Sequence, residues 1–524
     1  MDERVVSAAR LLPDYLSQHV LLSAASLALG LLISLPLVVA ASRHPAIRWP
    51  VLGFAAVAQT IPSLALLALF YPLLLALSAL SQYLFGFGFS ALGFLPSLLA
   101  LTLYSMLPIL RNGVTGLLGI DPAVIEAARG VGMTDRQRLL RVELPLAAPV
   151  LMAGVRTAAV WVIGAATLST PVGQTSLGNY IFSGLQVENW VSVLFGCGAA
   201  VALAMMTDQL LALIEAGVAR RSACRIWIGA GLLLAGIAAA AMALAGTAGR
   251  HGYLVGAKNF SEQYILADLI SDRIRATGRP VTTRIDLGST VAFRALAGND
   301  IDVYVDYSGT VWSTVMGRKD SVPRARMLQE MRSALRREHG VVLLGALGFE
   351  NAYALAMKRD RAVALGIRSI ADLARHAPQL TLGGDLEFFS RPEWRALRDR
   401  YRLSFHEQRQ YQPTFMYRAL ASGQADVISA FSSDGRIAAD DLLVLDDPLQ
   451  VIPPYDAIVL LSPARASDPV LRRALQPLIG AIPIQLMRQA NYQVDREVDK
   501  VTPAGAARWL SRAAHLEAPS DGPD

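Results

Sequence analysis

The chain has 524 residues, of which 53% are hydrophobic and only 17% are charged, and its formal net charge is +6. Long uncharged stretches fill the first 250 residues, and the first lysine of the protein is Lys258. This distribution excludes a single soluble globular domain and a disordered chain. The arginines of the first half lie between apolar stretches, which suits membrane topology better than nucleic-acid binding. Cys197 and Cys224 are too few for a disulfide framework or a structural zinc site.

The first half contains several stretches without Asp, Glu, Lys or Arg, at residues 15–42, 49–110, 157–187, 189–207 and 226–249. A helix that crosses a bilayer needs about 20 mainly apolar residues, so the second stretch has room for two, with a break around 81–89. We expect six spans, near 20–41, 52–78, 92–110, 150–170, 190–214 and 226–246. Buried helices of a soluble core are the alternative, but 62 consecutive uncharged residues would be hard to keep in solution.

Basic residues mark alternate connections between these spans, at positions 43 and 48, then 111–141, then 220–225. The connections 79–91 and 171–189 contain neither Lys nor Arg. Basic loops stay in the cytoplasm. The pattern therefore predicts a multi-pass protein of the cell (inner) membrane whose N-terminus and whole C-terminal half are extracytoplasmic.

The last apolar segment allows a second interpretation. Arginines at 220–225, an apolar run and then Ala243-Leu244-Ala245 also fit a secretory signal peptide with a small-residue cleavage site. The apolar run is longer than a usual signal core, which favours an uncleaved anchor over 221–250. Both readings stay open at this point.

The connection after the third predicted span has a distinctive spacing. It reads Glu126-Ala127-Ala128-Arg129-Gly130-Val131-Gly132, then nine residues, then Val142-Glu143-Leu144-Pro145. We expect a short amphipathic helix, a glycine turn and a return to the membrane marked by proline. Small residues let another surface approach closely, and the charged ones allow specific docking. Composition alone fits an ordinary basic loop equally well.

The spacing, however, resembles the EAA loop of importer-type ABC permeases, and the resemblance covers about residues 15–220. It implies a type I ABC importer permease whose loop 121–145 docks on a separate cytoplasmic ATPase subunit through Glu126, Ala127, Ala128 and Gly132. No G-x-x-x-x-G-K-[ST] phosphate loop occurs in the chain. We therefore expect no enzyme activity and no cofactor in this chain, with ATP bound by the partner subunit.

After Gly252 strand and helix patterns alternate, with strands at 253–257, 281–286 and 301–305 and helices at 261–276 and 291–297. This alternation predicts parallel sheets with helices on both faces. Extended apolar segments at 353–357 and 456–460 are candidate hinge strands. They divide an extracytoplasmic domain, 251–516, into lobe 1 (about 253–352 and 457–516) and lobe 2 (about 358–453). We expect the ligand between the lobes and a disordered tail over 517–524.

Four aromatic residues fall at predicted strand ends: Tyr307, Tyr353, Phe431 and Tyr455. Each one alone fits ordinary core packing. Together they suit an aromatic box for an alkylated ammonium, which is attracted to ring faces by roughly 0.5–2 kcal/mol per ring.

The run from Lys258-Asn259-Phe260-Ser261-Glu262-Gln263 through Pro453-Pro454-Tyr455-Asp456-Ala457 resembles the glycine betaine/choline/carnitine binding proteins of osmoprotectant importers. The resemblance covers most of 253–515. It implies a two-lobed α/β periplasmic-binding-protein domain of type II, with the four aromatic residues around the ammonium group. It also implies Lys258, Arg391 and Thr310 as partners of the ligand carboxylate. Phe431 stands where family members often have Tyr, which keeps the ring face and loses a hydroxyl.

Two cations and a hydroxyl fit a carboxylate, whereas choline would leave the cations unpaired in a desolvated cleft. Glycine betaine or a related zwitterion is therefore the favoured ligand, with carnitine, proline betaine, ergothioneine or choline as alternatives. Lys258 and Arg391 could instead form salt bridges between the lobes. Gly288-Ser289-Thr290 is a helix cap or an anion site.

Taken together, the sequence predicts a fused permease and substrate-binding subunit of an ABC importer, acting as a homodimer with two ATPase subunits in membrane lipid. It offers no nucleophile or acid/base pair, no metal-ligand cluster and no nucleic-acid surface. A membrane-tethered ligand sensor is the main rival, but it would need one or two spans and a signalling tail.

Overall fold

A computed structural model describes residues 3–86, 89, 93–187, 189–248, 252–318, 320, 322–496 and 498–516. The chain divides into a membrane unit, Met1–Phe182 with Trp190–Arg250, and an α/β unit, Ser183–Asn189 with His251–Asp524. The predicted disordered tail, 517–524, lies outside the described residues.

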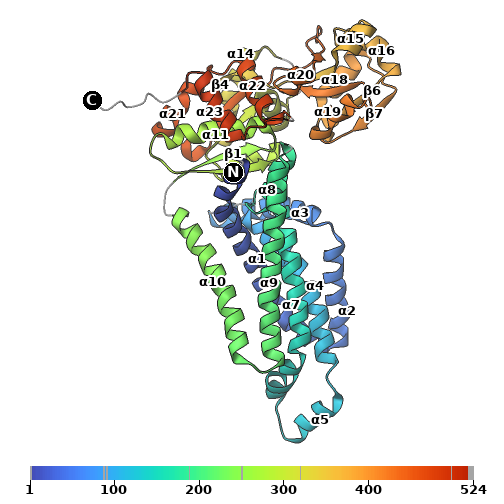
Figure 1. Ribbon diagram of the computed structural model, residues 1–524, viewed down its shortest axis with the longest axis vertical. Coiled ribbons are helices and arrows are strands. Elements are labelled where there is room, and N and C mark those ends of the chain that lie inside the picture. Colours follow the sequence, from blue (N-terminus) through green and yellow to red (C-terminus); the bar gives the residue numbers. More distant parts are fainter. Residues whose placement is uncertain are drawn as a thin grey trace, which may run out of the picture. The chain divides into compact units, whose positions relative to one another are not determined.

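In its described residues, all the regular secondary structure of the membrane unit is helical (Figure 1). Its α-helices are α1 (Glu3–Arg43), α2 (Pro45–Thr60), α3 (Ser63–Phe85), α4 (Phe94–Leu118), α5 (Pro122–Gly130), α6 (Asp135–Arg138), α7 (Leu144–Ala166), the first part of α8 (Gly178–Gln186), α9 (Trp190–Ala219) and α10 (Ala223–Ala248). A π-helical turn (Leu139–Glu143) precedes α7 and a 3-10 turn (Thr167–Val172) follows it. Within the described ranges, six helical segments are long and apolar enough to cross a membrane, as predicted.

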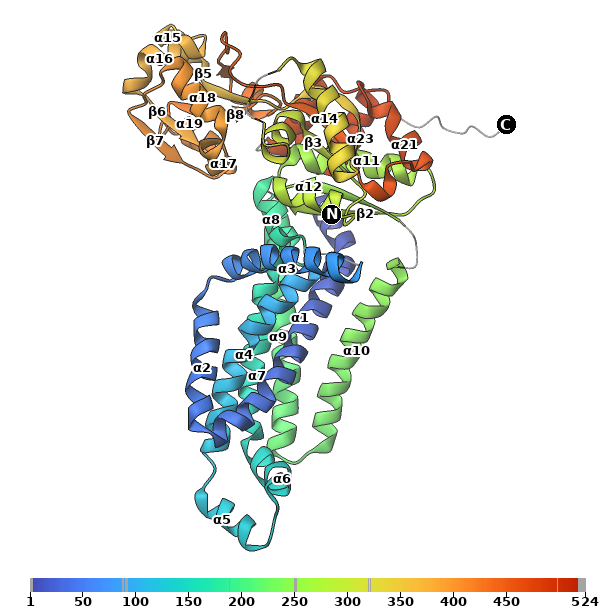
Figure 2. The ribbon, with the colours of Figure 1, turned by 180° about the vertical axis from the view of Figure 1, so that it is seen from behind.

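The predicted second span, 52–78, is wrong as a single helix. The chain forms α2 and α3 instead, with a break at Ile61 and Pro62. Proline disfavours helical geometry in the residue before it, and Ile61 is extended at φ −70° and ψ 127°. Figure 2 shows the result: α2 runs alongside α4, and α3 lies across one end of the bundle.

The basic connections of the membrane unit gather at one end of its bundle. The turn between α1 and α2, the segment with α5 and α6, and the turn between α9 and α10 all lie there, while the start of α1 and the end of α10 lie at the opposite end (Figures 1 and 2). The helices therefore traverse the bundle in alternating directions.

Small residues and one ionic cluster hold the bundle together. A Cβ at Gly154 would lie 2.7 Å from the carbonyl oxygen of Pro108, so glycine is what lets α7 approach α4. Arg156 of α7 forms ion pairs with Asp208 (2.9 Å) and Glu215 (2.8 Å) of α9. Charged side chains within membrane-spanning helices raise the free energy of the folded protein unless they are paired.

The α/β unit alternates strands and helices. Its strands are β1 (Tyr253–Lys258), β2 (Val281–Leu287), β3 (Val303–Tyr307), β4 (Val342–Glu350), β5 (Tyr353–Lys358), β6 (Thr381–Gly384), β7 (Glu407–Gln410), β8 (Val427–Phe431), β9 (Leu442–Val444) and β10 (Asp456–Leu461). Its longer helices are α11 (Ser261–Arg275), α12 (Ser289–Ala297), α14 (Arg324–His339), α18 (Pro392–Tyr401), α19 (Pro413–Ala421), α22 (Ile484–Asp495) and α23 (Pro503–Ala513). Its shorter ones are α13 (Ser308–Thr310), α15 (Arg359–Leu365), α16 (Ile370–His376), α17 (Leu386–Ser390), α20 (Arg436–Ala439) and α21 (Pro469–Leu475).

Two five-stranded sheets form the cores of two lobes, with strand orders β2-β1-β3-β10-β4 and β7-β6-β8-β5-β9. The expectation of parallel sheets is confirmed for the pairs β1–β2, β1–β3, β6–β7 and β6–β8, but it is wrong for β5 and β10. β1, β2 and β3 are parallel, but β10 is antiparallel to β3 and β4, and β5 is antiparallel to β8 and β9. The reason is topological, because β5 and β10 are the strands that enter after the chain has crossed from one lobe to the other. The two-lobed α/β class itself is confirmed.

Candidate ligand-binding site

A cavity of about 660 Å³ lies in the α/β unit and is lined by residues of both lobes. All seven ligand-binding residues predicted from the sequence line it: Lys258, Tyr307, Thr310, Tyr353, Arg391, Phe431 and Tyr455. They come from segments up to two hundred residues apart, so the fold gathers them in one place.

Sheet topology explains how this gathering arises. Lys258 and Tyr307 end the parallel strands β1 and β3, and carboxyl ends of parallel strands meet at one sheet edge. Antiparallel β10 begins at the same edge, with Ala457 opposite Tyr307, which brings in Tyr455. In the other lobe Tyr353, at the start of β5, is directly opposite Phe431, at the end of β8.

Three of the four predicted box residues are in direct ring contact. The Tyr353 ring centroid lies 5.1 Å from that of Phe431, and 5.7 Å from that of Tyr455 at an interplanar angle of 88°. A Cβ at Gly309 would lie 2.6 Å from the Tyr455 ring, so the absence of a side chain at this position makes room for the ring. The Tyr307 ring stacks instead on Phe260, at 6.1 Å.

The three phenols of the predicted aromatic box remain neutral. Burial raises the pKa of Tyr307, Tyr353 and Tyr455 well above the usual value, and nearby carboxylates raise it further. Neutral phenol rings present the electron-rich faces that attract a cation, without the charge of a phenolate.

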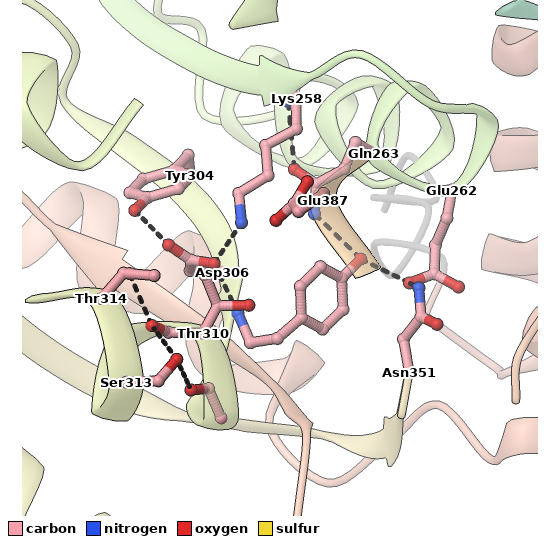
Figure 3. A network of polar contacts seen from close by, with 12 residues as sticks. Lys258, Glu262, Gln263, Tyr304, Asp306, Thr310, Ser313, Thr314, Asn351 and Glu387 are labelled. Carbon is pink, nitrogen blue, oxygen red and sulfur yellow. Dashed lines mark hydrogen bonds and ion pairs between the residues drawn. The ribbon is translucent and has the colours of Figure 1, made fainter. Parts of the chain in front are cut away.

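The ammonium group of Lys258 already has a carboxylate partner in the protein. It forms a buried ion pair with Asp306, which also accepts hydrogen bonds from the Tyr304 hydroxyl (2.6 Å) and the Tyr307 backbone N–H (2.7 Å) (Figure 3). The same ammonium lies 5.3 Å from the Tyr307 ring centroid. Lys258 is thus a buried cation held by its own lobe.

Arg391, only 6% exposed, is paired as well. Its guanidinium forms an ion pair with Glu387, which is half exposed, and a second N–H donates across the lobes to Ser313 Oγ at 3.3 Å. The guanidinium carbon lies 5.6 Å from the Tyr353 ring centroid. Two of the four predicted box rings, Tyr307 and Tyr353, therefore each lie near a cation of the protein.

These pairs bear on two of the sequence-based arguments. Lys258 with Asp306 and Arg391 with Glu387 are each within one lobe, so neither is a salt bridge between lobes. Because both cations have carboxylate partners before any ligand arrives, a ligand without a carboxylate does not leave them unpaired. The two cations therefore do not disfavour choline, contrary to the expectation from the sequence.

Glu262 is a cavity-lining residue to which the sequence analysis gave no role. It is 2% exposed, and it accepts hydrogen bonds from Tyr307 Oη (2.5 Å), Asn351 Nδ2 (3.2 Å) and Asn491 Nδ2 (3.0 Å). Burial raises the pKa of Glu262, and hydrogen bonds from these groups and Ser433 oppose that rise. Its place beside Lys258 and Phe260 in the quoted motif is a signal that could have found it, whereas no local pattern marks Asn491.

Three further predictions concern single positions. Thr310 is buried and lines the cavity. Gly288 is the N-cap of α12 without a side-chain cap, and it lines the cavity together with Ser289. Among the residues that the structure describes, no group of three or more His, Cys, Asp or Glu could hold a metal ion.

The loop 121–145 of the membrane unit contains α5, a short helix at the predicted place, capped by Asp121 (2.9 Å to the Ala123 N–H). Glu126 and Ala127 are exposed, and Ala128 is buried. Gly132 adopts φ +80°, which favours glycine, and nothing lies within 4 Å of a Cβ built there.

The return of this loop to the bundle is anchored by charge. Arg138, which is buried, pairs with Glu143 at 2.6 Å and with Asp135 at 2.9 Å. Glu143 also lies 3.6 Å from Arg43 at the end of α1. The base of the loop is therefore tied to the end of α1, while Glu126 and Ala127 are exposed.

Two family models match the chain. The inner membrane component of binding-protein-dependent transport systems matches residues 30–220, and the substrate binding domain of ABC-type glycine betaine transport systems matches residues 254–512.

Among characterised relatives, the ergothioneine transport permease/ergothioneine binding protein EgtU of Helicobacter pylori (strain G27) is 28% identical over 89% of this chain and 83% of its own length. The glycine betaine/carnitine/choline transport system permease protein OpuCB of Bacillus subtilis (strain 168) is 38% identical over 38% of this chain and 84% of its own.

Among solved structures, a glycine betaine/carnitine/choline ABC transporter structure is 26% identical, covers 50% of this chain and 98% of its own, and has a TM-score of 0.45. A choline-binding protein in complex with choline is 17% identical, covers 51% and 90%, and has a TM-score of 0.39.

Proposed function

The chain belongs to the permease family of binding-protein-dependent ABC importers and carries its own glycine betaine-type substrate-binding domain, and from this premise we propose that it imports a quaternary-ammonium compound. The observation that carries the proposal is the cavity in which the Tyr353 ring contacts the rings of both Phe431 and Tyr455. A methylated ammonium donates no strong hydrogen bond, so ring faces are its natural partners.

The class of cargo is inferred from a chemical group that the ligands of the relatives share. These relatives are named for the transport of glycine betaine, carnitine, choline and ergothioneine, all of which contain a trimethylammonium group. We assign that group to the aromatic box of Tyr307, Tyr353, Phe431 and Tyr455. A carboxylate, where the ligand has one, would bind to Arg391, Lys258 and Thr310, after displacing Glu387 from Arg391.

We place the α/β unit outside the cytoplasm, in the periplasm or its equivalent. The support is the arginine distribution: all the basic connections lie at one end of the bundle, and the end of α10 lies at the other. The anchor α10 is continuous over 26 residues, which favours a retained membrane helix over a cleaved signal peptide.

The energy for import comes, on this proposal, from a separate ATPase subunit that binds ATP. The exposed Glu126, Ala127 and Gly132, with Ala128 packed behind them, form the docking helix and turn. The membrane unit supplies half of a channel, so two copies of the chain with two ATPases in the lipid bilayer form the working importer. The lobes close on the ligand, the ATPases switch the channel to its outward-facing state, and hydrolysis resets it.

The test is calorimetry on the full chain in lipid nanodiscs with glycine betaine, carnitine, choline and ergothioneine. At least one should bind, and the neutral tert-butyl analogue of choline should bind far more weakly than choline if ring faces recognise the charge. Tyr353→Phe keeps the ring and should retain affinity, whereas Tyr353→Leu should lose roughly tenfold. Unchanged binding to Tyr307→Ala and Arg391→Ala would reject the site assignment.

A further inference from the structure

Glu262 orients two amide side chains of the cavity by accepting hydrogen bonds from both. Asn351 lies where the chain crosses from β4 to β5, and Asn491 belongs to α22. Both line the cavity, and both direct their Nδ2 atoms to the Glu262 carboxylate, at 3.2 and 3.0 Å. Asn491 Nδ2 also donates to the Ser433 carbonyl at 2.8 Å. Figure 3 shows the Asn351 side chain directed toward the Glu262 carboxylate.

The orientation of these amides follows from chemistry. A carboxylate accepts hydrogen bonds, so each amide must turn its nitrogen toward Glu262 and its oxygen away from it. Asn351 Oδ1 and Asn491 Oδ1 are both buried, and neither has a hydrogen-bond partner among the residues that the structure describes. Both residues are more than nine-tenths buried, at 8% and 3% exposure.

Other groups of the cavity do not meet this need. The nearby Tyr307 hydroxyl already donates to Glu262, and the ammonium of Lys258 pairs with Asp306. Arg391 donates to Glu387 and Ser313. A buried acceptor without a donor is unfavourable, so a group that brings an N–H or O–H to these amides gains affinity.

Building on the proposed function, we propose that Asn351 and Asn491 form a donor-recognising subsite, so that the preferred cargo carries a neutral N–H or O–H in addition to its quaternary ammonium. A hydroxyl, as in choline or carnitine, or a heteroaromatic N–H, as in ergothioneine, satisfies this requirement. Glycine betaine has no such donor and leaves both oxygens unpaired. The subsite thus selects among ligands that the aromatic box treats alike.

The test uses the full chain in nanodiscs and pairs of ligands that differ in one donor. Choline should bind about tenfold or more tightly than its O-methyl ether, which keeps the oxygen and loses the O–H. β-Methylcholine, which adds a methyl group and keeps the hydroxyl, controls for bulk. Ergothioneine against its ring N-methylated form tests the N–H source in the same way.

Variants assign the effect to the two amides. In Asn491→Ala and Asn351→Ala the preference for the donor-bearing member of each pair should shrink to less than about threefold. Gln489→Ala, on the exposed side of α22, should keep the full preference. Because both tests are ratios of affinities for one protein sample, partial misfolding of a variant cancels.

Each outcome decides a different question. If glycine betaine binds as tightly as the donor-bearing ligands and the paired ligands bind equally, ordered water satisfies the two oxygens and the subsite is refuted, while the importer of quaternary ammonium compounds stands. If no quaternary-ammonium ligand binds at all, the proposed function and the subsite both fall.

Discussion

At the scale of single residues, the partner of each charged group decides how easily a ligand carboxylate can bind in the cavity. The cations that a carboxylate ligand would use, Lys258 and Arg391, are already paired, but in different surroundings. Asp306 is 1% exposed and receives two further hydrogen bonds, whereas Glu387 is 53% exposed on its side-chain surface. A ligand carboxylate can therefore replace Glu387 more easily than Asp306.

This difference predicts the effect of Glu387→Gln. Neutralising Glu387 frees the guanidinium of Arg391, so carboxylate ligands such as carnitine should bind up to about fivefold more tightly, while choline should be unaffected. Calorimetry with both ligands measures the ratio, and Glu338→Gln, in an exposed ion pair with Arg337, serves as control. A loss of carnitine affinity would mean instead that Glu387 is needed to orient Arg391.

At the scale of elements, the contact of α22 with the segment after β8 joins the two lobes. Arg488 of α22 donates to the Ser432 carbonyl at 2.7 Å, and Asn491 donates to that of Ser433. Gly435 packs directly against the α22 backbone, because a Cβ there would lie 2.3 Å from the Tyr492 nitrogen. No side chain fits at this point without moving the segment.

Gly435→Ala should therefore push the segment away from α22 and lower the free energy of unfolding of the α/β unit by about 1–3 kcal/mol. Ligand affinity should fall with it, since Asn491 is displaced. Pulse proteolysis of the full chain in urea measures the stability. Gly288→Ala, where a Cβ meets open space, is the control for stability; equal stability of the two variants would contradict the contact.

Helix α11 contains a carboxyl group whose titration should be visible in stability. Burial, and then the negative charge of Asp272, raise the pKa of Asp268 to about 7, against the opposing effect of Arg275 and Arg508. The folded state then holds its proton more tightly than the unfolded state, whose pKa is near the ordinary value of about 4. Stability contributed by this group is complete below pH 4 and is lost as the pH rises to 7.

The expected loss between pH 4 and pH 7 has an upper limit of about 4 kcal/mol. Asp268→Asn, which cannot ionise, should flatten that part of the pH profile and be the more stable protein at pH 7. Pulse proteolysis across the pH range measures both. Parallel profiles for the variant and the natural chain would contradict the assignment.

At the scale of the whole molecule, one polypeptide combines a membrane helical bundle with a two-lobed binding domain. The fusion keeps the binding domain at the membrane, so capture and transfer of the ligand need no diffusional encounter between separate proteins. This advantage exists only if the α/β unit is on the side from which the cargo arrives.

Protease added to sealed spheroplasts should therefore digest the α/β unit and spare the loop 121–145. Inverted vesicles should show the reverse, because the positive-inside distribution of arginine sets the orientation. The fragments are identified with antibodies to the two segments. Protection of the α/β unit in spheroplasts would place it in the cytoplasm and overturn the import proposal.

The sequence by itself determined the six apolar segments, the family of the permease and the aromatic residues of the cavity, because hydropathy, motif spacing and strand-end positions are local properties of the chain. It did not determine the break at Ile61 and Pro62 or the antiparallel entry of β5 and β10. Those depend on how the helices pack in the bundle and on where the chain crosses between lobes.

Only the tertiary structure decided the partners of the polar groups. Lys258 meets Asp306 48 residues later, and Glu262 meets Asn351 and Asn491 across 89 and 229 residues. Nothing near Glu262 in the chain indicates these amides, because a buried hydrogen bond exists only where the folded backbone brings donor and acceptor to the same place. The aromatic residues could thus be predicted from their positions in the sequence, whereas the hydrogen-bond partners of Lys258 and Glu262 could not.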